Sequence, residues 1–170
     1  MTDFARLMSD YFVKYLAGQK GSGSNTMKTY RDTFVQLLEF MDEKKHIRAD
    51  CIEVDSFSYD IINEFLEYLE KEKRVSISTR NNRLAAIRSF FKYTGYHEPK
   101  YLNISTSIRE ISKKKTEGRQ MNYLSVNAME HFLNSFDKTD HKELRCFCIV
   151  LLLYESGARV TELCNVRRYD

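Results

Sequence analysis

The feature of this sequence that most constrains its fold is the spacing of its large apolar residues, which recur every three or four positions. The first such stripe comprises Phe4, Leu7, Met8, Tyr11, Phe12, Tyr15 and Leu16. Because an α-helix turns once in about 3.6 residues, this spacing places these side chains on one helical face. No convincing strand is found in the sequence. The spacing therefore predicts an all-α chain.

Three further apolar stripes predict the next helices, over 27–41, 61–69 and 84–91. Small polar residues that cap helix N-termini precede the second and fourth predicted helices, namely Ser24 or Asn25, and Ser76 or Ser78. Glycine is typical of the residue at which a helix ends. We therefore expect Gly18 to end the first helix and Gly95 to end the fourth.

Positive charge is concentrated in one contiguous part of the chain. Residues 73–119 hold twelve lysines and arginines against three glutamates, a net +9, whereas the whole chain carries +3, so the remainder sums to −6. A basic segment gains free energy when it releases counterions from phosphates, so this segregation favours a polyanionic partner. The alternative is a basic face that is merely solvated.

The segment 98–122 separates two helical regions. It loses the helical period, holds Pro99, the one proline, and contains the basic run SKKKTEGRQ. We interpret it as an extended basic linker between a helical domain over 1–97 and a second domain over 123–170.

The second domain begins with its own helix signals. Ser125 precedes an apolar stripe, and a more hydrophobic helix follows over about 143–156. Gly157 is placed to cap that helix in the left-handed conformation, and a further helix begins near Val160.

The stretch YESGARVTEL, residues 154–163, carries the most specific chemistry in the sequence. Arg159 follows the helix-ending glycine, and Glu162 stands three residues later. A guanidinium binds phosphate oxygens through two parallel hydrogen bonds and keeps its charge, so an anion is the expected ligand of Arg159. Glu162 can hold that guanidinium in position. Taken alone, the same two residues are also typical of an ordinary ion pair on a helix surface.

Three segments in order carry a resemblance to a known family. SNTMKTYRDTFVQLLEFM (24–41), SISTRNNRLAAIRSFFKY (76–93) and LLYESGARVTELCNVRRYD (152–170) resemble the tyrosine recombinases, also called the phage integrase family. The first two resemble the second and fourth helices of the N-terminal core-binding domain, and the third resembles the first catalytic box. The residues that match this box are Gly157, Arg159, Glu162, Leu163, Val166 and Asp170. The resemblance implies a SAM-like four-helix domain, a linker and the first helices of an incomplete mixed α/β catalytic domain.

The resemblance also implies a reaction, a cofactor-free phosphoryl transfer on duplex DNA through a 3′-phosphotyrosyl intermediate. Arg159 would stabilise the phosphate in the transition state, and Glu162 would support Arg159. The family's later elements, including a His/Arg pair and the nucleophilic tyrosine, have no match here, and Tyr154 is expected to be a core residue. We therefore expect an N-terminal part of a longer recombinase that does not cut DNA alone.

For DNA binding, the resemblance implies that the second and fourth helices face the major groove while the linker follows the backbone. The candidate DNA-binding residues are Thr26, Lys28, Thr29 and Arg31 on the second helix, Thr79, Arg80, Asn82, Arg83 and Arg88 on the fourth, and Lys113, Lys114, Lys115 and Arg119 in the linker. Which of them contact base edges and which contact phosphates stays open, and only base-edge contacts confer sequence preference.

The cysteines indicate no metal or disulfide framework. Cys51, Cys146, Cys148 and Cys164 form no CxxC pair, so we expect buried free thiols, no metal and no cofactor. The longest apolar run, 146–154, is far shorter than the roughly 20 residues of a membrane span.

The expected partner is double-stranded DNA, and the expected setting is a cytoplasmic, nucleoid-associated bacterial-type protein of a mobile element. The full-length recombinase is expected to be a tetramer on DNA, and this part of it a monomer. Two alternatives remain open. One is a stand-alone helical DNA-binding regulator without catalysis, and the other is an adaptor that binds proteins through its acidic 39–72 region.

Overall fold

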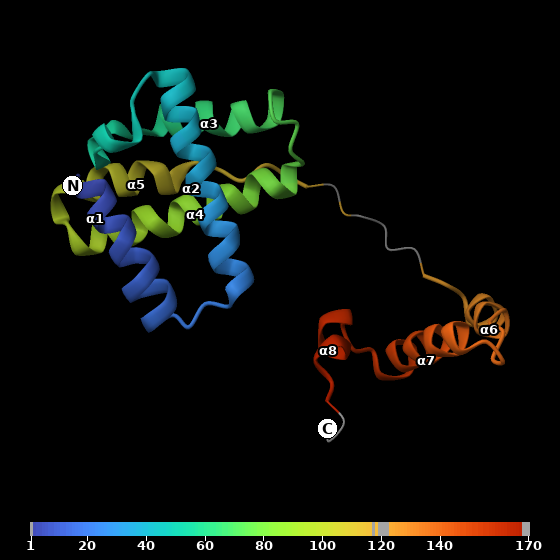
Figure 1. Cartoon of the computed structure of the whole chain (residues 1–170). Coiled ribbons are helices and arrows are strands. Elements are labelled where there is room, and N and C mark those ends of the chain that lie inside the picture. The colour runs from blue at the N-terminus through green and yellow to red at the C-terminus, as the bar shows by residue number, and fades with distance from the viewer. Residues whose placement is uncertain (1, 117, 119–122, 168–170) are drawn as a thin grey trace. The chain divides into compact units, whose positions relative to one another are not determined.

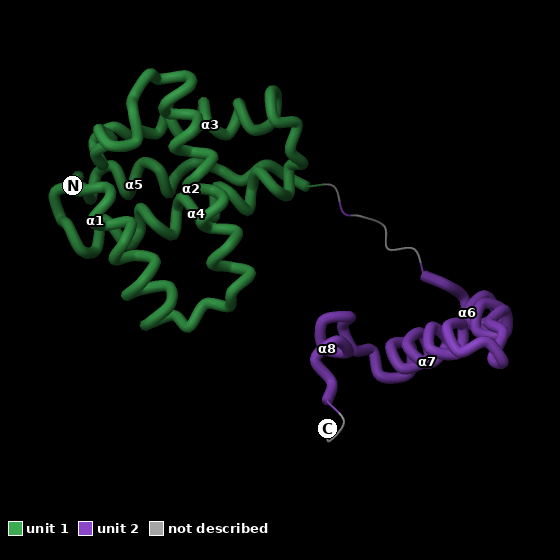
Figure 2. The backbone as a smooth tube through the Cα atoms, viewed as in Figure 1, with its two compact units in different colours: residues 1–117 green, residues 118–170 purple. Residues whose placement is uncertain are grey.

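The computed structural model describes residues 2–116, 118 and 123–167, and all regular elements in these ranges are helices (Figure 1). The chain divides into two compact units, unit 1 over residues 1–117 and unit 2 over residues 118–170 (Figure 2). The predicted all-helical fold is thus confirmed. None of the described helices is long and apolar enough to cross a membrane.

Unit 1 is built from six main helical elements. They are α1 (Asp3–Asp10), a π-helix (Tyr11–Gln19), α2 (Ser24–Lys45), α3 (Tyr59–Lys71), α4 (Ile77–His97) and α5 (Leu102–Glu110). Short 3-10 turns occupy Ala49–Cys51, Val54–Ser56 and Pro99–Tyr101. In Figure 1, α5 lies alongside α4, and α2 crosses α4.

Of the predicted helix boundaries in unit 1, the cap at Ser76 is confirmed and the cap of α2 is wrong, while the first helical stretch ends at Gln19, one residue past the predicted Gly18. Ser76 is the N-cap of α4, because its hydroxyl accepts a hydrogen bond from the Thr79 N–H at 3.2 Å. The N-cap of α2 is Gly23 instead of Ser24 or Asn25. Gly23 has the extended backbone of a cap, and its carbonyl accepts hydrogen bonds from the first turn of the helix.

Gly95 lies inside α4, which corrects its predicted place at the helix end. A Cβ at this position would lie 2.6 Å from Oγ and 2.7 Å from Cβ of Ser105 on α5. The glycine therefore allows α5 to approach the backbone of α4 closely. Because the residue serves this helix contact, α4 continues past it to His97.

The core of unit 1 is gathered around Phe90 of α4. Its ring centroid lies 5.3 Å from Phe34 of α2, 5.4 Å from Tyr11 of the π-helix and 5.5 Å from Phe4 of α1. These are edge-to-face contacts between buried rings, the arrangement that aromatic quadrupoles favour. Helix α4 is therefore central to the unit, and its remaining faces carry polar residues.

The segment 98–122 begins as folded structure, so the prediction of an extended linker from residue 98 is wrong. Residues 99–110 form a 3-10 turn and α5, and Tyr101, Ile108 and Ile111 are buried in the core. Sequence periodicity missed α5 because this helix has only nine residues, with few large apolar side chains among them.

Unit 2 contains α6 (Val126–Asn134), α7 (His141–Ser156) and α8 (Val160–Asn165). Ser125 is the N-cap of α6 and accepts a hydrogen bond from the Ala128 N–H at 3.2 Å. Gly157 ends α7 in the left-handed conformation, with φ of 63°. These three signals, including the start of α8 at Val160, confirm the prediction.

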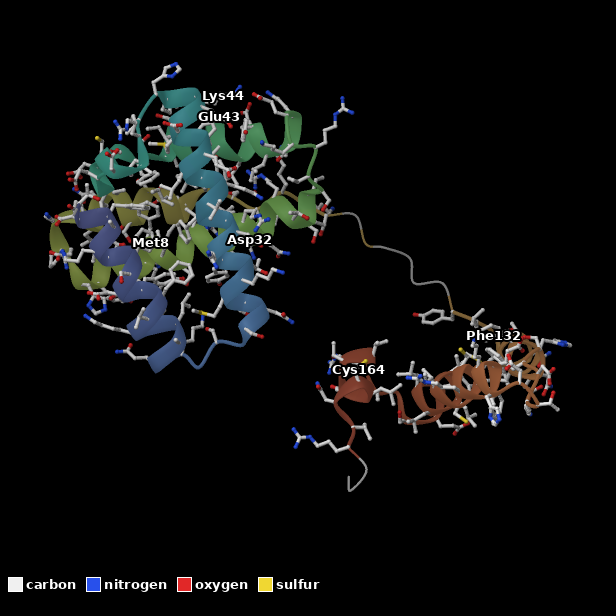
Figure 3. The ribbon with its side chains drawn as sticks, in the orientation of Figure 1. Met8, Asp32, Glu43, Lys44, Phe132 and Cys164 are labelled. Carbon is white, nitrogen blue, oxygen red and sulfur yellow. The ribbon has the colours of Figure 1, made fainter. Side chains whose placement is uncertain are left out.

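Among the described residues of unit 2, none is buried. Phe136 contacts Phe132 and Phe147 at 5.2 and 6.2 Å between ring centroids, but most of α7 is uncovered. Tyr154 is 47% exposed and all four cysteines of the chain are exposed, so the expectation that they are buried is wrong. Figure 3 shows Phe132 on α6 and Cys164 on α8 among the side chains of this unit.

Candidate nucleic-acid interface

A groove rich in positive charge lies on unit 1 at the middle of α4. It has a volume of about 480 Å³, and none of its described lining residues is acidic. The lining residues of this cationic groove are Tyr15, Lys20, Tyr30, Ala85, Arg88, Ser89, Lys92, Arg109 and Lys113. Lysines and arginines gathered without carboxylates suit the phosphates of a nucleic-acid backbone.

A second hollow, the polar pocket, adjoins the cationic groove between α2 and α4. Its volume is about 310 Å³, and its lining residues are Asn25, Thr26, Thr29, Tyr30, Asn82 and Ala85. Tyr30 and Ala85 line both hollows, which therefore form one continuous surface. Amide and hydroxyl side chains hydrogen-bond base edges, and the asparagine amide suits adenine.

The α4 residues of this surface lie on one stripe of the helix, and the sequence-based prediction identified only part of this stripe. Asn82, Ala85, Ser89 and Lys92 are spaced by three, four and three residues, which places them on one face of the helix. Extending this face from Asn82 would have found Lys92. No local signal points to Lys20 or Arg109, because they reach the groove from other elements.

Five of the predicted residues line the two hollows, namely Thr26, Thr29, Asn82, Arg88 and Lys113. Lys28 and Arg31 are exposed on α2 outside both hollows. The Thr79 hydroxyl lies 3.0 Å from the hydroxyl of Ser76 and belongs to the N-terminal cap of α4.

Two arginines of α4 fasten other helices to it. Arg83 donates a hydrogen bond to the Thr29 carbonyl oxygen of α2 at 3.0 Å. Arg88 donates to the Arg109 carbonyl oxygen at 2.6 Å and also to that of Ile111, at the C-terminal end of α5. The last carbonyl groups of a helix lack partners within it, so a cation there is stabilising. Both side chains therefore have structural contacts besides any contact with DNA.

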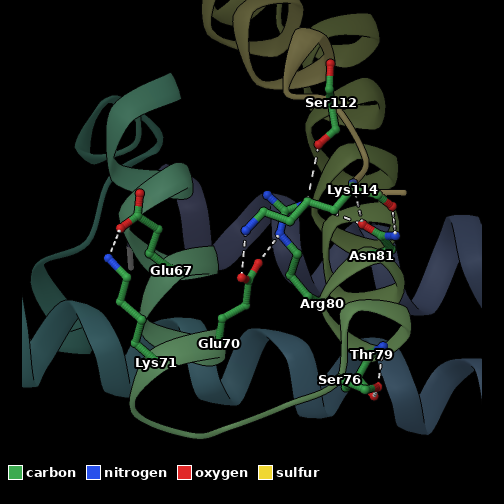
Figure 4. Close-up of polar contacts among 9 residues, drawn as sticks. All are labelled: Glu67, Glu70, Lys71, Ser76, Thr79, Arg80, Asn81, Ser112 and Lys114. Atoms are coloured by element: carbon green, nitrogen blue, oxygen red, sulfur yellow. Dashed lines mark hydrogen bonds and ion pairs between the residues drawn. The ribbon is translucent and has the colours of Figure 1, made fainter. Parts of the chain in front are cut away.

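Arg80 lies in the interior of unit 1, which corrects the expectation that it contacts DNA. Its side chain is 7% exposed, and its Nε lies 2.9 Å from Oε1 of Glu70 on α3 (Figure 4). Its Nη1 donates to the Ser112 carbonyl oxygen at 3.3 Å. A guanidinium buried against a carboxylate is not presented to a phosphate outside the protein.

Residues 111–116, here called the strap, follow α5 without regular structure. The Asn81 amide holds the strap at Lys114, because Nδ2 donates to the Lys114 carbonyl at 2.8 Å and Oδ1 accepts from its N–H at 3.1 Å (Figure 4). The Lys114 ammonium lies 2.7 Å from Oε2 of Glu70, whereas Lys113 lines the cationic groove. Lys115 is exposed, and Arg119 lies outside the described residues.

In unit 2, Arg159 stands between α7 and α8, and its side chain is 82% exposed. The Glu162 carboxylate accepts from the Arg159 backbone N–H at 2.7 Å and from Nη1 at 2.8 Å. Both hydrogen bonds lower the pKa of Glu162, and the one from the Arg159 backbone N–H has the larger effect. Glu162 thus holds both the backbone and the guanidinium of Arg159, and the other guanidinium N–H groups have no acceptor among the described residues. The matching position Asp170 is not among those residues.

Among the described residues, no group of three or more His, Cys, Asp or Glu side chains could hold a metal ion.

Comparisons with known proteins agree on one family. Residues 10–99 match the family described as "Phage integrase, N-terminal SAM-like domain". The chain is 27% identical over 166 residues to y4rC of Sinorhizobium fredii and 28% identical over 166 residues to y4rD of that organism, both named as integrase/recombinase. It is 27% identical over 165 residues to the tyrosine recombinase XerC of Staphylococcus aureus.

These alignments cover 98%, 98% and 96% of this chain but 50%, 59% and 51% of the respective relatives. The chain therefore spans between 50% and 59% of the length of these three relatives. No solved structure matches the chain.

Proposed function

The chain belongs to the phage integrase family of tyrosine recombinases, and from that premise we propose that unit 1 binds double-stranded DNA through the cationic groove and the polar pocket. The observation that carries this proposal is the continuity of the two hollows, one without carboxylates and one with amides and hydroxyls. Phosphate contacts supply affinity, and base-edge contacts supply sequence preference.

Each hollow has its own part in this interface. Lys20, Lys92, Arg109 and Lys113 are the phosphate ligands. Asn25, Thr26 and Asn82 face the base edges. Arg88 lines the groove, but its guanidinium serves mainly to fasten the end of α5.

In the whole protein, the proposed reaction is the cutting and rejoining of duplex DNA through a 3′-phosphotyrosyl intermediate, without a cofactor. Arg159 is the transition-state ligand of the phosphate, since its guanidinium is exposed and held by Glu162. Glu162 positions Arg159 and transfers no proton. The nucleophilic tyrosine is not assigned to any residue of this sequence. The whole protein acts as a tetramer on DNA, and this chain alone is a monomer.

The salt dependence of duplex binding tests the interface. Four phosphate contacts predict a slope of log affinity against log salt of about −3.6, since each contact contributes about 0.9. A rise from 50 to 200 mM salt should then weaken binding roughly 150-fold, measured by fluorescence anisotropy with a random-sequence duplex. An affinity that does not change across this range would contradict the proposal.

Charge-matched variants locate the contacts. Replacing Lys92 and Lys113 together by alanine should make the slope shallower by about 1.8. The matched control replaces Lys44 and Lys71 together by alanine, since these two lysines pair with Glu72 and Glu67 and lie outside both hollows. The control should keep the wild-type slope.

The catalytic role of Arg159 is tested in the full-length recombinase. Arg159→Ala should keep site binding but lower covalent attachment of DNA by about 100- to 1000-fold, the cost of losing one preorganised ligand of the transition state. Arg145→Ala, which removes an exposed arginine of α7, is the control. Undiminished strand transfer by Arg159→Ala would exclude the catalytic role.

A further inference from the structure

We propose that Asn81 is a positioning residue, which fixes the strap on α4 so that Lys113 stays in the cationic groove. This proposal rests on the proposed DNA contact of that groove. Asn81 lines neither hollow, and its position next to Asn82 gives no sign of a separate role. Its contacts to the strap are what distinguish it.

The Asn81 amide pairs with both backbone groups of one strap residue. It donates to the Lys114 carbonyl at 2.8 Å and accepts from the Lys114 N–H at 3.1 Å. Outside regular structure, a backbone N–H and C=O need partners from side chains or water. A primary amide carries a donor and an acceptor side by side and can satisfy both groups at once. Alanine can satisfy neither.

Two further side chains of α4 hold the strap just before this point. Arg88 donates to the Ile111 carbonyl oxygen, and Arg80 donates to that of Ser112 at 3.3 Å. The backbone of residues 111, 112 and 114 is thus attached to one helix, and Lys113 lies between two attached residues. Its side chain therefore extends from a fixed stretch of backbone, and it lines the groove.

Glu70 explains why the neighbouring residues Lys113 and Lys114 have different roles. Its carboxylate lies 2.9 Å from Arg80 and 2.7 Å from the Lys114 ammonium, and its own side chain is only 22% exposed. Lys114 is thus held toward α3 (Figure 4). Lys113, in contrast, lines the cationic groove. In this arrangement Lys113 is the phosphate ligand and Lys114 is part of the attachment.

Backbone amide exchange of the chain without DNA tests the attachment. The Lys114 N–H should exchange about tenfold or more slowly than those of Lys113 and Lys115, as a hydrogen-bonded amide in a non-helical segment. Asn81→Ala should remove this difference. Asn81→Asp keeps the acceptor and should keep much of the protection, and Asn103→Ala, an exposed asparagine of α5, is the control. Equal rates in the wild-type protein would overturn the proposal.

The salt dependence of duplex binding tests whether Asn81 keeps Lys113 in contact with a DNA phosphate. Asn81→Ala should make the slope shallower by about 0.9, the value of one phosphate contact, although it removes no charge. Lys113→Ala should have the same effect, and the double variant should be no shallower than Lys113→Ala, since both changes remove one contact. A merely structural role of Asn81 would not produce this dependence on Lys113.

The two proposals fail differently. If the wild-type chain binds duplex DNA with a steep slope and Asn81→Ala has the same slope, the positioning role is overturned while the interface stands. If the wild-type chain shows no salt-dependent binding, the proposed interface itself fails. Asn81 is half-buried on a helix and alanine is the best helix former, so the variant should fold.

Discussion

Replacing Arg80 by alanine removes one half of the ion pair that joins α4 to α3. The side chains of Arg80 and Glu70 are 7% and 22% exposed, and Nε lies 2.9 Å from Oε1. Removing one partner of a buried pair costs roughly 3–5 kcal/mol, because the other charge stays buried. Glu70 keeps its contact with Lys114 and some access to solvent, so the lower end applies, about 3 kcal/mol.

Urea unfolding of the chain, followed by circular dichroism, measures this loss. With an m-value of about 2 kcal/mol/M, the unfolding midpoint of Arg80→Ala should fall by about 1.5 M. Lys92→Ala on the same helix is the control, and its stability should stay within about 0.5 kcal/mol of wild type, since Lys92 is exposed. Replacing Arg80 and Glu70 together by methionine should recover most of the loss, because no buried charge is then left unpaired.

One result would refute the burial argument. If Arg80→Ala unfolded within about 1 kcal/mol of wild type and yet lost duplex binding while folded, Arg80 would act mainly on DNA. The expected result is the reverse, a large loss of stability and duplex binding that persists wherever the variant remains folded.

Three further changes test other features of unit 1. Gly95→Ala should lower the free energy of unfolding by about 2 kcal/mol, because the new Cβ would lie 2.6 Å from the Ser105 Oγ; an unchanged urea midpoint would contradict this. Arg74 has φ of 51°, so Arg74→Gly should raise the melting temperature by relieving about 1 kcal/mol of left-handed strain, whereas Arg74→Ala should not. The pKa of Asp3 is lowered by a hydrogen bond from Lys100 and, to a smaller extent, by one from Tyr101. The ionised Asp3 carboxylate therefore stabilises the fold above its ordinary pKa of 3.8, and this stabilisation is lost as the pH falls through the pKa of Asp3 in the folded protein. Urea midpoints measured into the acid range should therefore fall less steeply for Asp3→Asn than for wild type.

Features that act within one or two turns of chain were predictable. Ser76 and Ser125 cap the helices that follow them, and Gly157 ends α7, because a cap depends on a few neighbouring backbone groups. The position of Arg159 at the start of α8 and its hydrogen bonds with Glu162 belong to the same class, since the residues are three apart.

Features that depend on neighbours distant in sequence were not predictable in this way. Gly95 has the local pattern of a helix end, but Ser105 on another helix explains its presence inside α4. Helix α5 has too few large apolar residues to show its period, yet Ile108 is buried against unit 1. Such packing is an interaction between elements and leaves little trace in either segment alone.

By itself, the sequence determined the helical fold, the placement of most helices and the local geometry around Arg159, because hydrophobic periodicity and caps are local. Only the tertiary structure decided which charged side chains of α4 are exposed and available to bind a partner. Arg80 and Lys92 are both cations on one helix, but Glu70 approaches the first from α3 while the second lines an open groove. The physical reason is that the exposure and pairing of a charge are properties of its three-dimensional surroundings, which residue type and helical spacing do not specify.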